Sequence, residues 1–449
     1  MTDVDVVVVG GGLAGLACAF ELAERDVGVL LLEAGAVVGG RTASWVEDGM
    51  PVESGLHRFL GFFSALPDLL KRCGVDLDEM VCWEDEFEIR VPDGGAQGIL
   101  GMSPVHKPLR TFGGILANND LLSPLDKLSL SWFMAAGMKD YLRNPDELDR
   151  HTVAEYAKSH RVTDRAIHNL LIPLTAGLFF LPPERFSAGI FFGLLAPGVP
   201  RIHQMRLGAY MGGMTEVQCQ PIADAVVAEG GEVRTDAEVE ALVVRDGAVA
   251  GVRLGGQTVE AGHVVVATNI EAAQRLLRPH FAAQPWSEPF LSMPTTPSVT
   301  IQLDLDRPSM DIDRTVFGPG TALACFAEQS RTTFRGSPGR LSIILTPPEP
   351  YLDMAPDDVL AVVVRDAARL GIDLEGHVTR FRVISHPHDF HSLEPGHLGA
   401  RPDQATPVPG LSLAGDFTRQ KYMASMEGAV VSGQRAAELA AAELGGEAS

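Results

Sequence analysis

The sequence predicts an α/β fold with three parts: a discontinuous domain built on a βαβ unit, a second domain with a mixed or antiparallel β-sheet, and a helical insert. Three observations carry this prediction. A buried-strand pattern, a glycine-rich turn and a helix open the chain, strand-like segments follow residue 298, and long apolar helical faces lie between them. At 449 residues the chain is also far longer than one typical domain.

Composition and charge exclude several classes of protein. The 58 acidic and 36 basic residues give a formal charge of −22, which repels nucleic-acid phosphates, so we expect no nucleic-acid partner. The five cysteines form no C-x-x-C pair, and their odd number does not indicate a disulfide framework. The N-terminus carries acids where a secretory signal has bases. A cytoplasmic location is therefore expected.

The first element is a βαβ unit. Val6 to Val9 have the pattern of a buried strand, and Gly10, Gly12 and Gly15 then complete G-x-G-x-x-G. Glycines in this turn let the backbone approach a pyrophosphate, which meets the free N–H groups at the start of the following helix. The pattern predicts a dinucleotide site.

The helix and the second strand support this prediction. Leu13 and Ala14 lie in the first turn of the helix, between the glycines that approach the pyrophosphate. The second strand ends at Glu33, followed by Ala34, at about the distance downstream where an acid accepts hydrogen bonds from ribose hydroxyls. Strand, helix and acid together are more specific than the glycines alone.

The loop beyond the acid indicates which dinucleotide is bound. Gly39 and Gly40 allow close approach, and the guanidinium of Arg41 can pair with phosphate oxygens. This Glu-x5-Gly-Gly-Arg spacing resembles the signature of the large FAD-dependent amine oxidase and carotenoid desaturase superfamily. The resemblance implies that the cofactor is FAD and that this part is a Rossmann-like FAD-binding domain.

A second segment belongs to the same domain. Residues from Gly230 to Asn269 alternate like paired strands and end in a buried strand. The resemblance implies that Val239 lies against the adenine and that Ala267 and Thr268 lie near the dinucleotide turn. A valine at this position is equally typical of a protein core, and both roles are compatible.

The C-terminal stretch "LAGDFTRQKYMASMEGAV" completes the site. Leu411 to Ala414 predict a final strand, and a helix begins at Met426, whose free N–H groups can face the flavin pyrimidine carbonyl. The stretch is similar to a distinctive signature of plant- and cyanobacterial-type phytoene desaturases. The resemblance implies cofactor contacts at Gly415, Asp416, Ser425, Met426 and Ala429.

The segment "ESGLHRFLG" strengthens this resemblance, because it is similar to a desaturase segment near the isoalloxazine. By the resemblance, Gly55, Leu56 and His57 lie near the flavin. Arg58 occupies a position where those desaturases usually have an apolar residue. Two interpretations stay open: Arg58 serves a more polar substrate, or it forms an ion pair with Glu53.

The domain boundaries follow from these segments. We expect the FAD-binding domain to contain 1–70, 214–285 and 400–449. The substrate-binding β domain is expected from 71–99 and 286–399, with its strands starting near Ser298. Residues 100–213 form the helical insert, a possible lobe for membrane contact and substrate access.

The insert is very apolar but is not a transmembrane segment. Prolines, Glu184 and Arg185 interrupt the stretch from Leu170 to Gly198, whereas a span needs about 20 apolar residues. A monotopic patch on Leu170 to Leu195 would give an apolar lipid direct passage from a bilayer, and plain core is the alternative interpretation. Peripheral contact with the inner face of the membrane stays open.

The predicted function is FAD-dependent desaturation of a long apolar isoprenoid such as phytoene or a related carotenoid precursor, with hydride transfer to flavin N5. An oxidase of amines or other smaller substrates is the alternative, and a non-redox carrier of prenyl lipids is an alternative of another class. A quinone or oxygen would reoxidise the flavin. The spacing of the residues assigns no catalytic side chain.

A group of histidines needs separate consideration. The segment "SHPHDFHSLEPGH" contains His386, His388, His391 and His397. The acid at Asp389 is one place too early for an H-x-H-x-D-H pattern, and the sequence shows no partner cluster. We therefore expect no metal site.

Overall fold

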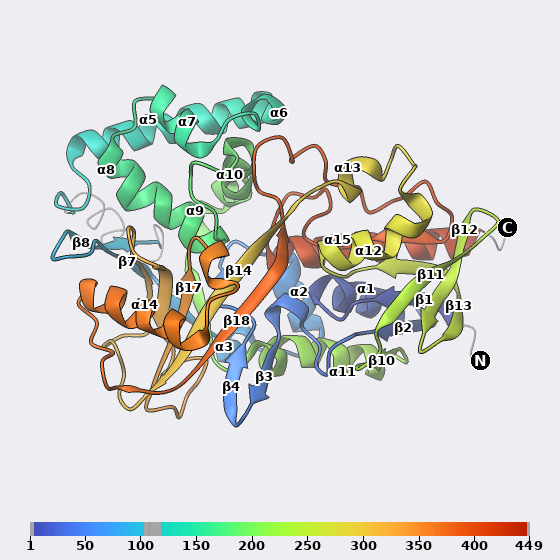
Figure 1. Ribbon diagram of the computed structural model, residues 1–449. Helices are drawn as coiled ribbons and strands as arrows, with labels where there is room; N and C mark the ends of the chain where they lie inside the picture. The colour runs from blue at the N-terminus through green and yellow to red at the C-terminus, as the bar shows by residue number, and fades with distance from the viewer. Residues whose placement is uncertain (1–3, 103–106, 108–117, 447–449) are drawn as a thin grey trace.

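The computed structural model describes residues 4–102, 107 and 118–446. The parts of the predicted helical insert at 103–106 and 108–117 lie outside the described residues. Figure 1 shows a sheet with its helices beside both termini, a second sheet on the opposite side, and a lobe of helices above it. This arrangement of α/β layers confirms the predicted fold class.

The first sheet draws its strands from distant parts of the chain. Its order is β10 (Glu232–Arg234), β2 (Val29–Leu32), β1 (Val4–Val9), β13 (Gln257–Val266), β12 (Ala248–Leu254) and β11 (Val239–Arg245), with β19 (Leu411–Leu413) also on β13. The strands β10, β2, β1, β13 and β19 pair in parallel, whereas β13, β12 and β11 are antiparallel. The carboxyl ends of β1, β2 and β13 therefore meet at one edge.

Tightly packed helices cover this sheet. Every residue of α1 (Leu13–Ala23) is buried, and α1 packs against α15 (Met426–Gly446) and α11 (Gln220–Ala228). A Cβ added at Gly433 of α15 would lie 2.1 Å from the carbonyl oxygen of Ala14, so only glycine allows this approach. Small residues thus hold the C-terminal helix against the first helix.

The second sheet has the order β18 (Val378–His391), β14 (Thr295–Leu305), β17 (Gly339–Leu345), β16 (Leu323–Glu328), β15 (Thr315–Phe317), β7 (Glu86–Arg90) and β8 (Gln97–Gly101). All neighbours pair antiparallel except β15 and β7, which are parallel. The strands from 295 onward agree with the predicted strand segments. The helix α14 (Pro356–Arg369) packs on this sheet.

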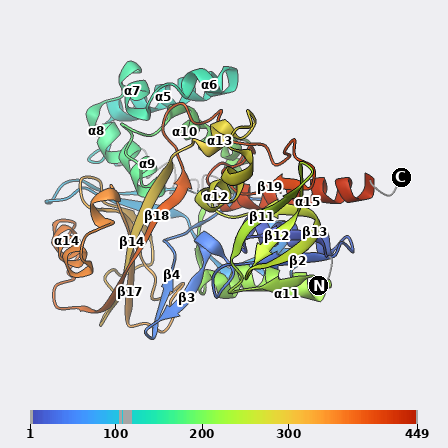
Figure 2. The same cartoon turned by 45° about the vertical axis from the view of Figure 1, so that its right-hand side comes forward.

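Short elements connect the two large sheets. A hairpin forms from β3 (Ser44–Glu47) and β4 (Met50–Glu53), and a small sheet forms from β5 (Phe59–Leu60), β9 (Leu207–Tyr210) and β6 (Val81–Glu84). The short helices α2 (Ala65–Arg72) and α3 (Leu77–Met80) lie between β5 and β6 in the sequence. Figure 2 shows the β3–β4 hairpin, which leads into residues 54–58, between the two large sheets. The predicted domain boundaries stay a prediction.

The helical lobe is built from α5 (Pro124–Arg143), α6 (Pro145–Leu148), α7 (Val153–Ser159), α8 (Asp164–Ala166), α9 (Ile172–Phe179) and α10 (Ala188–Leu195). Its core contains a group of aromatic rings: Phe133, Tyr156, Phe186, Phe191 and Phe192. Within the described residues, none of the helices combines the length and hydropathy needed to cross a bilayer.

The helical lobe has an exposed apolar face on α5, outside the segment from Leu170 to Leu195. Most of the segment from Leu170 to Leu195 is buried in the core of the lobe, which agrees with the interpretation of this segment as plain core rather than as a monotopic patch. A group of exposed apolar side chains lies on the outer face of α5, where Leu125, Leu128 and Trp132 are 65%, 67% and 65% exposed. Their spacing places them on one helical face.

Candidate functional site

The carboxyl ends of β1 and β13 form the first part of the site. Gly10 has φ +107°, and a Cβ there would lie 2.8 Å from the carbonyl oxygen of Ala267, so a larger residue would force the two strand ends apart. The Ala267 N–H donates to the Val9 carbonyl at 2.8 Å. Thr268 follows, half buried. Gly12 precedes α1 and no side chain caps this helix, so its first N–H groups are open to a ligand.

The second part lies around Glu33 at the end of β2. Its carboxylate accepts hydrogen bonds from the N–H groups of Gly11 at 2.6 Å and Gly35 at 2.7 Å. Its carbonyl oxygen accepts from the Ala237 N–H at 2.8 Å, which brings the start of β11, with buried Val239, beside Glu33. Ala34 is exposed next to this junction.

The Gly-Gly-Arg loop lies across the start of α1. Gly39 and Gly12 form a β-bridge, and a Cβ on Gly40 would lie 3.3 Å from the Cα of Gly12. The loop therefore closes against the glycine-rich turn, and Leu13, Ala14 and Gly15 pack behind it within α1. The segments of Gly10 to Gly15 and of Gly40 and Arg41, predicted separately, are thus neighbours.

Arg41 joins the N-terminal and C-terminal motifs. Its guanidinium forms a short ion pair with Asp416 and lies 3.8 Å from the carboxylate of Asp389, measured from Nε, while its central carbon lies 5.1 Å from the ring centre of Phe390. Burial alone would lower the pKa of Arg41, but Asp416 and Asp389 outweigh burial and raise it. The guanidinium stays charged.

Side chains from the C-terminal motif hold its turn in place. The Gly415 N–H donates to Ser432 Oγ at 2.8 Å, and the Gly428 N–H donates to Ser425 Oγ at 3.1 Å. The Ala429 N–H donates to the Ser425 carbonyl at 3.0 Å, so Ser425 lies at the start of α15. Met426 Sδ accepts from the Tyr210 hydroxyl at 3.3 Å.

Glu427, in the same motif, has a structural role that the sequence reasoning missed. Its fully buried carboxylate accepts from the N–H groups of Ser64 at 2.7 Å, Ala65 at 2.8 Å and Leu66 at 2.9 Å. These donors form the start of α2, where a negative charge is favourable. The acid therefore ties the C-terminal turn to the segment after His57. Its place inside the quoted motif was the only signal.

The Gly55 to Arg58 segment lies between the two sheets. Gly55 is buried, and its carbonyl oxygen lies 3.2 Å from His57 Nδ1. Burial, and then the charges of Arg41 and Arg58, outweigh this contact and lower the pKa of His57 to about 4, so the imidazole is neutral near pH 7. Leu56 packs against the hydrophobic cluster that joins the helical lobe to the second sheet.

Arg58 forms an ion pair, but with a different partner from the expected one. Its Nε lies 3.1 Å from Glu84 and donates to Thr315 Oγ1 at 2.8 Å, and its Nη1 donates to the His57 carbonyl at 3.1 Å. Both charged side chains are buried. The Glu53 carboxylate accepts from the Met214 N–H at 3.3 Å instead, while Gln302 bonds to the Glu53 backbone, so the predicted Arg58–Glu53 pair is wrong.

The histidine segment makes separate contacts with neighbouring strands and loops. His386 Nε2 lies 3.3 Å from the Ser54 carbonyl oxygen, and His388 Nδ1 lies 2.8 Å from Thr295 Oγ1. In the part of the chain that the structure describes, no three His, Cys, Asp or Glu side chains form a group that could hold a metal ion.

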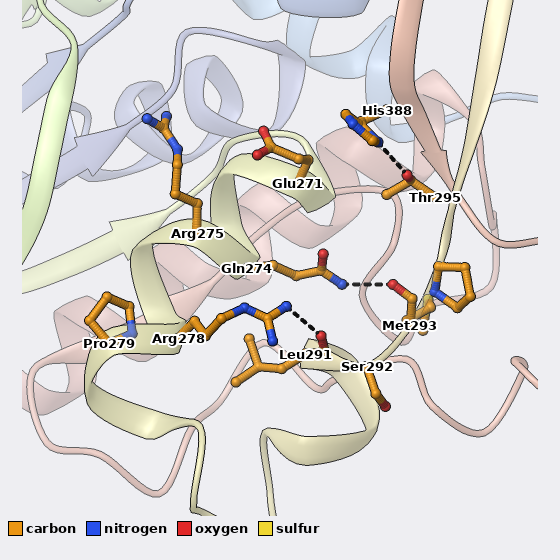
Figure 3. A pocket seen from close by; sticks show the side chains of 11 residues that line it. Glu271, Gln274, Arg275, Arg278, Pro279, Leu291, Ser292, Met293, Thr295 and His388 are labelled. Atoms are coloured by element: carbon orange, nitrogen blue, oxygen red, sulfur yellow. Dashed lines mark hydrogen bonds between the residues drawn. The ribbon is translucent and has the colours of Figure 1, made fainter.

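A separate cavity of about 750 Å³ opens beside this region. Figure 3 shows it between α12 (Ile270–Phe281), the short α13 (Glu288–Leu291) and the strands that carry Thr295 and His388. Its wall combines Arg275, which pairs with Glu238 at 3.0 Å, with Arg278, which donates to the Leu291 carbonyl at 2.7 Å. The predicted cofactor-binding residues are not among those that line it.

Known proteins define the class of this fold and site. The family model of flavin containing amine oxidoreductases matches residues 13–441, so the chain belongs to this family and is an FAD-dependent oxidoreductase. It is 28% identical to the 15-cis-phytoene desaturase of Synechococcus elongatus, over 96% of this chain and 95% of that protein. It is also 27% identical to a probable zeta-carotene desaturase of the same organism, over 96% and 98%.

Solved structures agree on the fold. A putrescine oxidase double mutant superposes with a TM-score of 0.77 and 18% identity, over 98% of this chain and 99% of that chain. At this identity the likeness concerns the fold alone. The predicted superfamily, the predicted cofactor and the predicted resemblance to phytoene desaturases are confirmed.

Proposed function

We propose that the protein desaturates a long apolar isoprenoid, such as phytoene or a related carotenoid precursor. Two findings support this proposal. Relatives that are phytoene and zeta-carotene desaturases match nearly the whole chain. In addition, Leu56, which is predicted to lie near the flavin, packs against a hydrophobic cluster that extends into the helical lobe. The putrescine oxidase is a solved structure at 18% identity, so its likeness concerns the fold and not the substrate. Desaturation is therefore favoured over amine oxidation.

The cofactor is proposed to bind along the edge where the motifs meet. The open N–H groups of α1, the close approach of Gly10 to Ala267 and the charged Arg41 suit a pyrophosphate. Glu33 suits the ribose hydroxyls at one end, and the start of α15 suits the flavin at the other. The proposed contacts are those predicted from the sequence: Gly10, Gly12, Leu13, Ala14, Gly15, Glu33, Ala34, Gly40, Arg41, Gly55, Leu56, His57, Val239, Ala267, Thr268, Gly415, Asp416, Ser425, Met426 and Ala429.

The observation that most supports an apolar substrate is the apolar packing beside Gly55, Leu56 and His57. Leu56, Phe390 and Ala424 come from three distant parts of the chain, and all three pack against the hydrophobic cluster that joins the helical lobe to the second sheet. An apolar surface therefore runs from the proposed cofactor site into the lobe. A long hydrocarbon gains about 0.8 kcal/mol for each CH₂ that leaves water, so such a surface suits it.

The buried ion pair of Arg58 supports the same class of substrate. Because Arg58 is already paired with Glu84, it does not bring a free charge to the substrate. His57 is held neutral by burial and by nearby guanidinium groups. Bound FAD supplies the hydride acceptor for the reaction. The chain itself holds the target C–C bond in place and excludes water from it.

Membrane contact is proposed through the outer face of α5. Leu125, Leu128 and Trp132 are exposed there, whereas the opposite face of the helix, including Leu130 and Phe133, is buried. A helix with apolar side chains on its outer face is suited to lie in the boundary between lipid headgroups and acyl chains. An isoprenoid could then pass from the bilayer into the lobe without entering water.

The proposal is tested with purified, FAD-bound protein and phytoene in liposomes, under nitrogen with an added quinone and under air without it. We expect a product with further conjugated double bonds, seen as new absorbance bands. Product with quinone alone identifies a quinone as the acceptor, and product under air alone identifies oxygen. An unchanged polyene in both arms, with amines oxidised instead, would reject the proposal.

A further inference from the structure

The end of β18 carries polar atoms that the assigned site leaves unexplained. Asp389 and His391 are two residues apart on this strand, so their side chains lie on the same face. Asp389 is 8% exposed and His391 is 1% exposed. Among the described residues, neither Asp389 Oδ1 nor either ring nitrogen of His391 has a hydrogen-bond partner. Buried polar atoms without partners are rare and call for a ligand or a water.

Asp389 is held in place through its other oxygen. Asp389 Oδ2 accepts from the Ser298 hydroxyl at 2.6 Å, across the pair of strands β14 and β18. The residue that follows it, Phe390, lies under the Arg41 guanidinium. The substrate-domain strand therefore presents Oδ1 towards Arg41, at 3.8 Å from its Nε.

Charge counting limits what Oδ1 can bind. Arg41 is shared between Asp389 and the buried carboxylate of Asp416. A pyrophosphate at the start of α1 brings further negative charge to the same guanidinium. One cation cannot compensate all of these anions, so a carboxylate here needs neutral donors. A carboxylate also repels a phosphate, whereas a hydroxyl can donate a hydrogen bond to the carboxylate.

The position along the groove indicates which hydroxyls these are. Glu33, the acid expected at the ribose, lies at the end of β2 and accepts from Gly11 and Gly35. Asp389 shares Arg41 with Asp416, and Gly415, next to Asp416, donates to Ser432 of α15 at 2.8 Å. The hydroxyls of FAD beyond the pyrophosphate in this direction are those of its ribityl chain.

We propose that Asp389 is an additional cofactor-binding residue, supplied by the substrate domain, whose Oδ1 accepts a hydrogen bond from a ribityl hydroxyl of FAD. His391 lies beside it and provides a neutral imidazole, because burial lowers its pKa to about 3 despite the opposing influence of Asp416. The inference rests on the proposed cofactor groove and is independent of the substrate.

The test measures FAD dissociation from the FAD-bound protein by equilibrium dialysis, without substrate. Asp389→Leu removes the acceptor, and Asp389→Asn keeps an acceptor oxygen. We expect the dissociation constant to rise about tenfold or more for Asp389→Leu and clearly less for Asp389→Asn, as for the loss of one hydrogen bond to a charged group. Asp126→Leu, which removes a buried acid of the helical lobe, should leave the constant within about twofold.

Deoxyribityl analogues of FAD identify the contact. Removing the correct hydroxyl should weaken binding to the natural protein but cause no further loss in Asp389→Leu. ADP, which lacks the ribityl chain, should bind both proteins equally. An unchanged FAD constant in a folded Asp389→Leu protein would overturn the proposal. A second result would also overturn the proposal. If Asp389→Leu weakens the binding of every deoxyribityl analogue as much as that of FAD, and has no effect once Arg41→Met is present, then Asp389 only positions Arg41.

Because no substrate is used, these results do not depend on the proposed desaturation. A protein that retains FAD through Asp389 but leaves phytoene unchanged would reject the proposed function and support this inference. If the natural protein desaturates phytoene but Asp389→Leu leaves the FAD dissociation constant unchanged, the proposed function is supported and this inference is rejected.

Discussion

The segment between Arg41 and Arg58 separates two very different surroundings. On the side of Arg41, the guanidinium lies close to acids from two other parts of the chain, Asp389 and Asp416. On the side of Leu56, aromatic and aliphatic side chains form a large hydrophobic cluster. The first surface needs particular atoms at particular distances, whereas the second needs only volume and shape. The polar side suits one cofactor, and the apolar side suits a class of substrate.

The largest effect on the polar side should come from Glu427. Glu427→Ala leaves the N–H groups of Ser64, Ala65 and Leu66 without their buried acceptor. We expect a loss of more than about 3 kcal/mol in the free energy of unfolding, measured by urea denaturation. Glu438→Ala removes an exposed acid of the same helix and should stay close to the natural protein. Equal losses in both variants would contradict the role given to Glu427.

The buried ion pair between Arg58 and Glu84 should give the next largest effect. Arg58→Met or Glu84→Gln alone leaves a partner without its counter-charge or donor, and Arg58→Met should cost about 3 kcal/mol. The double variant should lose clearly less than the sum of the two single variants. Purely additive losses would mean that Arg58 serves something other than Glu84. The exposed pair of Arg234 and Glu232 provides the control with little expected coupling.

A smaller effect should appear in the pH dependence of stability. Burial raises the pKa of Glu53 from 4.5 to about 7 in the folded protein. The native state thus keeps its proton while the unfolded chain releases it, so stability from protonated Glu53 is present near pH 4.5 and is lost as the pH rises to 7. Glu53→Gln should gain about 2 kcal/mol relative to the natural protein between roughly pH 5 and pH 8. A difference independent of pH would contradict the raised pKa.

The smallest effect on stability is expected on the outer face of α5. Leu128→Asp and Trp132→Asp change exposed side chains, so the free energy of unfolding should move by less than about 0.5 kcal/mol. Binding to liposomes, measured by flotation, should nevertheless fall strongly, because apolar side chains leave the bilayer boundary. Val46→Asp changes an equally exposed residue of the β3–β4 hairpin and should bind as the natural protein does. Equal binding by all three variants would reject the proposed surface.

The same contrast explains what the sequence could predict. Gly10, Glu33, Arg41 and Asp416 lie in short local motifs because each meets a defined partner, and the predicted fold and cofactor class followed from these motifs. Asp389 lies far from these motifs in sequence and reaches Arg41 only through the register of β14 and β18. No local spacing records such a contact.

The apolar side was harder to place for a different reason. The segment from Leu170 to Leu195 and the helix α5 are both rich in apolar residues, and composition does not tell which one is covered. Only packing shows that the first forms the core and that α5 keeps an apolar outer face. Similarly, the partner of Arg58 is Glu84 rather than Glu53 because β6 and β15 bring Glu84 to it.

The most direct test of the account is a single-turnover experiment without oxygen. FAD-bound protein is mixed with phytoene in liposomes and, in parallel, with putrescine, and the absorbance of the oxidised flavin is followed. The account predicts bleaching by phytoene and none by putrescine. Bleaching by putrescine, or by neither compound, would contradict the claim that the apolar surface beside Leu56 binds the molecule that FAD oxidises.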